Sequence, residues 1–228
     1  MLWRPKGGTA PGPEREGSSR HQSNEMDINP LHTDQLPQWW GRVLEGDTHA
    51  FHSIHRMLFR GLYDYALKLL QDAQLADDAV QELFVKVWVK RAVIGPLQKV
   101  KPYFFTALRR QILNQMRNRQ VRELRIGGLP KPDIEFSPEE IVVRNEEYQS
   151  LQARIATVLN ELPKRQKEVI YLHYFEEMDY SQIADVMGIH YQSVLNLTQK
   201  ALRKLRSADL MALLLSLSAL YIASKAFQ

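Results

Sequence analysis

Apolar residues recur at three- and four-residue spacing through most of the chain, which predicts helices from residue 36 onward. Asp47 and Asp72 each precede such a stretch and predict helix starts, whereas Gly95 and Pro96 predict a loop. Residues 121–136 contain two glycines and two prolines without periodicity, so we expect a flexible linker there. The pattern therefore predicts an all-α protein in which this linker joins two small helical domains, residues 26–120 and 137–207.

The two ends of the chain depart from this pattern. Residues 1–25 contain four glycines, three prolines and few apolar residues, which is typical of a disordered extension. A translation start at Met26 is an alternative to one at Met1. Residues 208–228 contain an apolar run that we expect to form a helix. The run spans about 21 Å, short of a bilayer core of about 30 Å, so it is expected to dock on the second domain or on a partner rather than cross a membrane.

Residues 179–206 carry a helix-turn-helix pattern. Asp179 and Gln182 predict a capping box that opens one helix, and Gly188 predicts the left-handed turn that ends it. One face of the following helix is apolar, at Val194, Leu197, Ala201 and Leu205. Another carries hydrogen-bonding side chains, at Gln192, Asn196, Gln199 and Arg203. Such a row can hydrogen-bond to base edges in the major groove, which favours a DNA-binding helix-turn-helix. The alternative interpretation is an ordinary helical hairpin whose polar face is solvated.

Charge strengthens the nucleic-acid interpretation through its distribution. The net charge is only +4, but eight basic residues and one acid, Glu123, lie between Lys99 and Arg125. So one-sided a run favours a polyanionic partner. Tyr103 and Phe105 lie within this run, and aromatic residues beside bases are typical of sites for unpaired nucleotides. The spacing of Phe105 favours a core position, whereas Tyr103 suits either role.

Several kinds of chemistry find no support. The chain has no cysteine, which excludes disulfides, thiolate zinc sites and cysteine nucleophiles. Its seven histidines lack metal-ligand spacing, and its Ser and Asp residues form no triad signature. We therefore expect no enzyme activity, catalytic residue, cofactor, metal or small-molecule substrate. The N-terminus lacks the apolar core of a secretory signal, so a cytoplasmic location is expected.

The order of these motifs resembles the extracytoplasmic-function (ECF) sigma factors of RNA polymerase, the minimal members of the sigma-70 family, and is similar to the group abundant in Bacteroidetes. The resemblance covers roughly residues 45–206. It rests on an acidic and aromatic helix at 77–88, on the segment 101–117, and on Leu162-Pro163-Lys164-Arg165-Gln166 leading into the helix-turn-helix. It implies sigma region 2 in residues 26–120, sigma region 4 in residues 137–207, and a non-catalytic protein that gives core RNA polymerase its promoter specificity.

The resemblance also implies three sets of binding residues. The segment that docks on the β′ clamp coiled coil corresponds to Asp77, Asp78, Gln81, Glu82, Phe84 and Trp88. Recognition of the −10 element corresponds to Lys99, Lys101, Tyr103, Arg109, Arg110, Asn114 and Arg117. Recognition of the −35 element corresponds to Gln192, Ser193, Leu195, Asn196, Gln199, Lys200 and Arg203.

Partners implied by the resemblance are core polymerase, including its β flap, promoter DNA, and an anti-sigma factor that would clamp both domains. Several positions depart from the family pattern. His190 and Tyr191 stand where the recognition helix of relatives often begins with Ser or another small cap. Leu195 stands where relatives commonly have a basic residue, and Arg110 stands where many have Asn. Base preference therefore does not carry over.

Two other functions compete. A helix-turn-helix regulator could bind operator DNA without polymerase, but its first domain would have to be a sensor, and residues 45–120 predict only helices with a basic end. An adaptor that binds through its apolar tail would leave the basic run unexplained.

Overall fold

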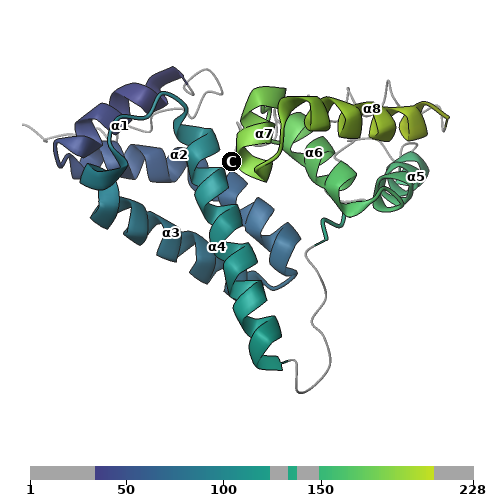
Figure 1. The fold of residues 1–228 in the computed structure, drawn as a ribbon, viewed down its shortest axis with the longest axis horizontal. Coiled ribbons are helices and arrows are strands. Elements are labelled where there is room, and N and C mark those ends of the chain that lie inside the picture. Colours follow the sequence, from purple (N-terminus) through teal and green to yellow (C-terminus); the bar gives the residue numbers. More distant parts are fainter. Residues whose placement is uncertain (1–33, 124–132, 138–148, 208–228) are drawn as a thin grey trace, which may run out of the picture.

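The computed structural model describes residues 34–123, 133–137 and 149–207. Within these ranges the chain forms eight helices and no strand, so the predicted all-α class is confirmed (Figure 1). Helices α1 to α4 form the first domain and α5 to α8 the second. The expected N-terminal extension, residues 1–25, and the expected C-terminal helix, residues 208–228, lie outside the described residues.

The first domain is built from four helices: α1 (Leu36–Leu44), α2 (Thr48–Leu70), α3 (Ala73–Ile94) and α4 (Val100–Glu123). The predicted starts are confirmed, because Asp47 accepts hydrogen bonds from two backbone N–H groups of α2 and Asp72 accepts one from α3. Between α2 and α3, Gln71 adopts a left-handed conformation (φ 54°). The resulting turn brings α3 back along α2.

Aromatic side chains fill the core of the first domain. Trp40 of α1 is 1% exposed, and its indole N–H donates to the carbonyl of Gly95 at 2.8 Å. Phe104 and Phe105 of α4 are fully buried, which confirms a core position for Phe105. Phe84 of α3 packs on Phe104 with ring centroids 5.3 Å apart. Each such side chain contributes about 1.5–3 kcal/mol by leaving water, so α4 is firmly anchored along its buried face.

The second domain contains α5 (Gln149–Asn160), α6 (Lys164–Tyr174), α7 (Tyr180–Met187) and α8 (Tyr191–Ser207). The capping box of α7 is confirmed: Asp179 accepts from the N–H of Gln182 at 2.7 Å, and the Gln182 side chain accepts from the N–H of Asp179 at 3.0 Å. Gly188 ends α7 with φ +63°, a value that favours glycine. These two signals fix the turn between α7 and α8.

The linker region differs from expectation at both of its ends. Helix α4 begins at Val100 and continues to Glu123, past the expected boundary at residue 120. Pro102 is tolerated because the first turn of a helix has no intrahelical partner for its N–H groups. Residues 133–137, which we call the strap, are packed, with Ile134 and Phe136 buried.

The strap contacts both domains. The side chain of Asn160 donates to the Phe136 carbonyl and accepts from the Phe136 N–H, both at 2.9 Å. On the other side, Lys68 of α2 donates to the Glu135 carbonyl. The described part of the expected linker is therefore a packed segment rather than a free one.

Candidate nucleic-acid interface

Helix α8 presents a polar row to solvent. Its apolar residues Val194, Ala201 and Leu205 are buried against the rest of the second domain, and Leu197 is half-buried. Six of the seven expected −35 residues are exposed and Leu195 is half-buried; the exposed six are Gln192, Ser193, Asn196, Gln199, Lys200 and Arg203. The row therefore combines amides, which suit adenine edges, with cations, which suit guanine edges and phosphates.

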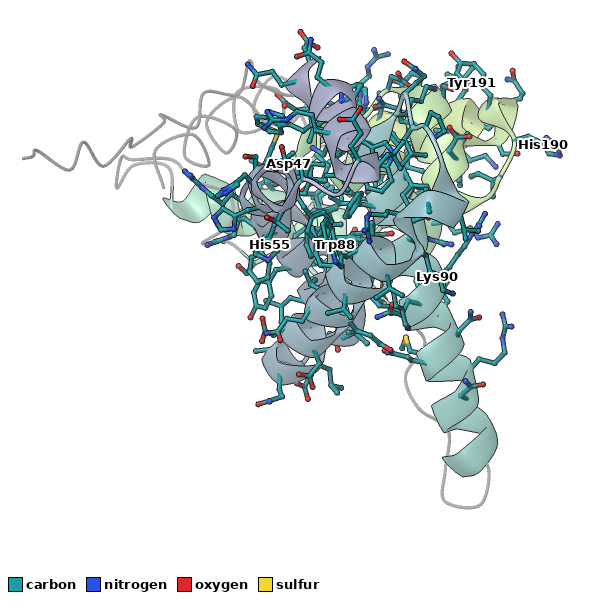
Figure 2. All side chains as sticks on the ribbon, turned by 90° about the vertical axis from the view of Figure 1, so that its left-hand side faces the viewer. Asp47, His55, Trp88, Lys90, His190 and Tyr191 are labelled. Carbon is teal, nitrogen blue, oxygen red and sulfur yellow. The ribbon has the colours of Figure 1, made fainter. Side chains whose placement is uncertain are left out.

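The start of α8 projects from the domain. His190 and Tyr191 lie at an outer edge of the molecule in Figure 2. Tyr191 is 51% exposed and meets Tyr180 edge-on, with ring centroids 6.5 Å apart. Sequence reasoning did not assign Tyr191 to the site, although an aromatic residue in the first turn of a recognition helix was a usable signal. The geometry allows the N-terminal end of α8 to enter a groove first.

Helix α4 carries a second exposed row. Tyr103, Arg110, Asn114 and Arg117 are spaced by seven, four and three residues, which places them on one face of a helix. Arg110, Asn114 and Arg117 are exposed, and Tyr103 is half-buried. Burial raises the pKa of Tyr103, while the nearby charge of Arg110 opposes that rise. The row offers cations, an amide and an aromatic edge, a combination suited to a nucleic-acid strand.

Arg109 does not join that row. It was expected to face solvent or DNA, but its side chain is only 17% exposed and points at the second domain. Its guanidinium binds both carboxylate oxygens of Glu168 on α6, with Nε–Oε1 at 2.7 Å and Nη2–Oε2 at 3.2 Å. Tyr65 of α2 donates to the same Oε1 at 2.6 Å. We call Tyr65, Arg109 and Glu168 the hub.

Burial shapes the protonation of the hub. Burial alone would lower the pKa of Arg109, but the hydrogen bonds and charge of Glu168 outweigh it and raise that pKa. Burial also raises the pKa of Tyr65 well above its usual value, and the charge of Glu168 adds to the effect. Arg109 therefore stays charged and Tyr65 stays a neutral donor over the physiological range of pH.

Two lysines expected at the −10 site also contact the second domain. Lys101 donates to the Glu176 carbonyl at 2.7 Å and lies 3.2 Å from Glu176 Oε2. Lys99 donates to Ser181 at 3.2 Å and lies 4.0 Å from a carboxylate oxygen of Asp185, with all three side chains at the surface. Three of the seven expected −10 residues are thus held against acidic or polar groups of α6, α7 and the loop between them.

Helix α3 presents the acidic face. Asp78, Gln81 and Glu82 are exposed and Asp77 is half-buried. Glu82 pairs with Lys86 at 2.7 Å and accepts a hydrogen bond from Gln111 of α4 at 2.9 Å. This face was expected from sequence, and its acids lie at the surface.

The aromatic edge expected beside that face is smaller than predicted. Phe84 is 4% exposed because its ring packs on Phe51, His55 and Phe104, so it belongs to the core. Trp88 is half-buried, with the guanidinium of Arg91 4.2 Å from its ring. Figure 2 shows Trp88 on the same face of the molecule as His55.

Helix α3 also carries an exposed apolar row that was not predicted from the sequence. Val85, Val89 and Val93 are 63%, 70% and 91% exposed. Their four-residue spacing on the otherwise polar side of the helix was the signal that could have revealed them. Exposed β-branched residues in such a row are typical of a protein contact rather than of a solvated helix face.

Metal and membrane features are absent from the described residues. Within residues 34–123, 133–137 and 149–207, no group of three or more His, Asp or Glu side chains is placed to hold a metal ion. No helix in the same ranges is both long and apolar enough to cross a membrane.

Two stretches of the chain match known protein families. Residues 54–122 match "Sigma-70 region 2" and residues 152–205 match "Sigma-70, region 4". The first match spans most of α2, with α3 and nearly all of α4; the second spans most of α5 and the remaining helices. Two solved structures share the fold. The first is CnrH in complex with the cytosolic domain of CnrY, at 19% identity and a TM-score of 0.52, covering 77% of this chain and 97% of that one. The second is the sigma factor RpoE in complex with the anti-sigma factor NepR from Bartonella quintana, at 22% identity and a TM-score of 0.54, covering 69% of this chain and 94% of that one.

Curated relatives agree with these matches. The chain is 30% identical over 158 residues to the ECF RNA polymerase sigma factor SigL of Mycobacterium tuberculosis, covering 65% of this chain and 87% of SigL. It is 23% identical over 182 residues to SigK of Mycolicibacterium vanbaalenii, covering 78% and 90%, and 25% identical over 156 residues to SigM of Bacillus subtilis, covering 67% and 92%. An operator-binding regulator is not favoured by these relatives, which are all ECF RNA polymerase sigma factors. The chain therefore belongs to the ECF sigma factors of the sigma-70 family and acts in transcription as a sigma factor.

Proposed function

We propose that this sigma factor binds core RNA polymerase through α3 and recognises promoters through α4 and α8. The observation that carries the proposal is the row on α8, because six of its polar side chains are exposed while the apolar residues Val194, Ala201 and Leu205 are buried. Contacts from such a row to base edges in the −35 element would supply sequence selectivity, and contacts from Lys200 and Arg203 to phosphates would supply affinity.

The polymerase contact that we propose combines charge with apolar area. Asp78, Gln81 and Glu82 would form its polar part, and Val85 and Val89 its apolar part. A docking surface of this kind has a dry centre and a polar rim. Asp77 and Trp88 border it, whereas Phe84 acts from the core by holding α3 in place. The β′ clamp coiled coil is the proposed partner of this surface, and the β flap that of the second domain.

At the −10 element, the exposed row of α4 is the proposed first contact. Tyr103 would stack on an unpaired base while Arg110, Asn114 and Arg117 hold the strand. Lys99, Lys101 and Arg109 would join them only when they leave their partners in the second domain.

Further features of the proposal follow from the family. We propose sigma region 2 over residues 26–120 and sigma region 4 over residues 137–207, a non-catalytic role, a cytoplasmic location and control by an anti-sigma factor. The complex of RpoE with NepR supports the last point. We also propose membership of the Bacteroidetes group. The relatives above come from Mycobacterium, Mycolicibacterium and Bacillus, so a phylogenetic tree of ECF sigma factors is the test of this proposal.

Co-purification with core polymerase tests the proposal. The variant Asp78→Arg/Glu82→Arg reverses two charges on the proposed docking surface, and Asp34→Arg/Glu45→Arg reverses two exposed charges elsewhere. We expect the first variant to lose binding to core polymerase and run-off transcription from a genomic promoter pool, while the control keeps both. A chain that binds duplex DNA but not polymerase would contradict the proposal.

A further inference from the structure

The hub joins the two domains through buried, charged groups. Glu168 comes from α6 of the second domain, while Arg109 and Tyr65 come from α4 and α2 of the first. Both oxygens of Glu168 are used, and the residue is 7% exposed. A paired guanidinium and carboxylate with parallel hydrogen bonds is the strongest arrangement these two groups can form. The contact is therefore specific rather than incidental.

The surroundings of the hub add further links between the domains. Glu176, 3% exposed, pairs with Lys101 and accepts a hydrogen bond from Tyr171 at 3.3 Å. The backbone of α2 comes close to this carboxylate at Gly61, where a Cβ atom would lie 2.7 Å from Glu176 Oε2. The ring of Tyr65 also stacks on that of Tyr171, with centroids 5.9 Å apart. The two domains are thus closely packed around both acids.

The acids of the second domain pair with two cations of the basic segment. Arg109 and Lys101 are cations of the basic segment, and each has its charge neutralised by a carboxylate of the second domain. A guanidinium whose two donor edges grip one carboxylate cannot grip a phosphate in the same way at the same time. Binding of Arg109 to Glu168 and binding of Arg109 to DNA therefore exclude each other.

We propose that the hub holds the free sigma factor in a closed, autoinhibited form, in which Glu168 and Glu176 stand in for promoter phosphates on the −10 segment. This proposal rests on the proposed function, because it regulates the same α4 surface. Separation of the two domains releases Arg109 and Lys101 for the promoter. The exposed row on α8 stays accessible in both forms, so closure selectively withholds part of the −10 segment.

Chain length permits this separation. Residues 124–132 join α4 to the strap, and nine residues reach at most about 30 Å. The strap can remain with the second domain, because Asn160 hydrogen-bonds to its backbone and Phe136 packs on Phe175. Two ion pairs add to these contacts: the ammonium groups of Lys164 and Lys167 lie 3.5 and 3.3 Å from the carboxylate of Asp133. The contacts of Lys68 and Gln71 with the strap would then break.

The test compares Glu168→Gln with Glu161→Gln in the full chain. Both variants neutralise one glutamate of the second domain, but Glu161 forms an exposed pair with Lys204 inside that domain. Because the chain has no cysteine, Arg56→Cys and Arg154→Cys place one dye on each domain at exposed positions for energy-transfer measurements. The second readout is affinity for a fluorescent single strand that carries the −10 sequence found by run-off transcription.

We expect Glu168→Gln to lower energy transfer and to raise the single-strand affinity of the free chain roughly tenfold or more, since breaking a buried pair is strongly unfavourable for the closed form. Glu161→Gln should change neither. Equal behaviour of the two variants would overturn the closed form. If Glu168→Gln fails to fold by circular dichroism, Tyr65→Phe removes one hub hydrogen bond and keeps the ring; it should raise affinity about threefold, and no change would overturn the proposal.

Failure of the proposed function would look different. A wild-type chain that gives no promoter-dependent transcript with core polymerase refutes the promoter role, whatever the energy transfer shows. A wild-type chain that transcribes normally, combined with unchanged energy transfer in Glu168→Gln and Tyr65→Phe, refutes autoinhibition alone.

Discussion

Removal of the Phe136 ring should unfold the packed part of the linker region. The ring is 2% exposed, lies 5.6 Å from the ring of Phe175 and has the ammonium of Lys68 5.5 Å from its centroid. Truncation of a buried phenylalanine costs about 3–5 kcal/mol. We take the lower end, about 3 kcal/mol, because a short segment can move to fill part of the cavity. That loss is a large share of a typical total stability of about 5–15 kcal/mol.

Urea unfolding measures the effect of Phe136→Ala. With a denaturant slope of about 2 kcal/mol per molar, a loss of about 3 kcal/mol lowers the midpoint by about 1.5 M. Asn160→Ala should lower it by less, because it removes two hydrogen bonds worth about 1–3 kcal/mol together. Glu135→Ala is the matched control, since its side chain is exposed and the carbonyl that Lys68 contacts is retained. Equal midpoints for Phe136→Ala and Glu135→Ala would refute the packing of the strap.

Three further predictions concern the remaining sites. Asp179→Ala removes the cap of α7 and should cost about 0.5–2 kcal/mol, seen as a lower melting temperature with a parallel loss of −35 duplex affinity. Burial, together with the charge of His52, lowers the pKa of His55 below its usual value of 6.5. The unfolded chain therefore binds a proton at this histidine more readily than the folded chain, and the melting temperature should fall as the pH is lowered from 7.5 to 5.5. His55→Gln should make this decrease in melting temperature smaller. Asn196→Ala should weaken discrimination at one base pair of the −35 element by about 1–3 kcal/mol, whereas Lys200→Ala should weaken all sequences alike and reduce the slope of affinity against salt by about one, both measurable by fluorescence anisotropy.

Signals that act within a few residues were predictable from the sequence. The capping box of Asp179 and Gln182 spans three residues, and the turn at Gly188 depends on its own backbone. The exposed row of α8 followed from helical periodicity, because burial of Val194 and Ala201 fixes the orientation of the whole helix. Local geometry was sufficient in each case.

Signals that depend on distant partners were not predictable in this way. The spacing of Phe84 allowed both a core position and a surface edge, and only its packing on Phe51, His55 and Phe104 from two other helices decides between them. Arg109 has the same ambiguity, since its partner lies 59 residues further along the chain. A basic residue in a basic segment is expected to face a polyanion, and the sequence does not show that the anion is a carboxylate of the same molecule.

The chemistry of the hub explains how one interface can be both specific and reversible. An interface of apolar side chains alone would expose apolar surface to water when the domains separate. The unfavourable free energy of that exposure would favour permanent closure. The two groups of a buried ion pair lose their hydration when the pair forms, so the net stabilisation from the pair is small. After separation each charged group is hydrated again, which makes the open form accessible. Arg109 and Glu168 regain hydration when the domains part, and promoter phosphates then offer Arg109 a second charged partner. The same desolvation makes a mismatched contact unfavourable, so the proposed closed form has a single register, and promoter phosphates compete with Glu168 for Arg109.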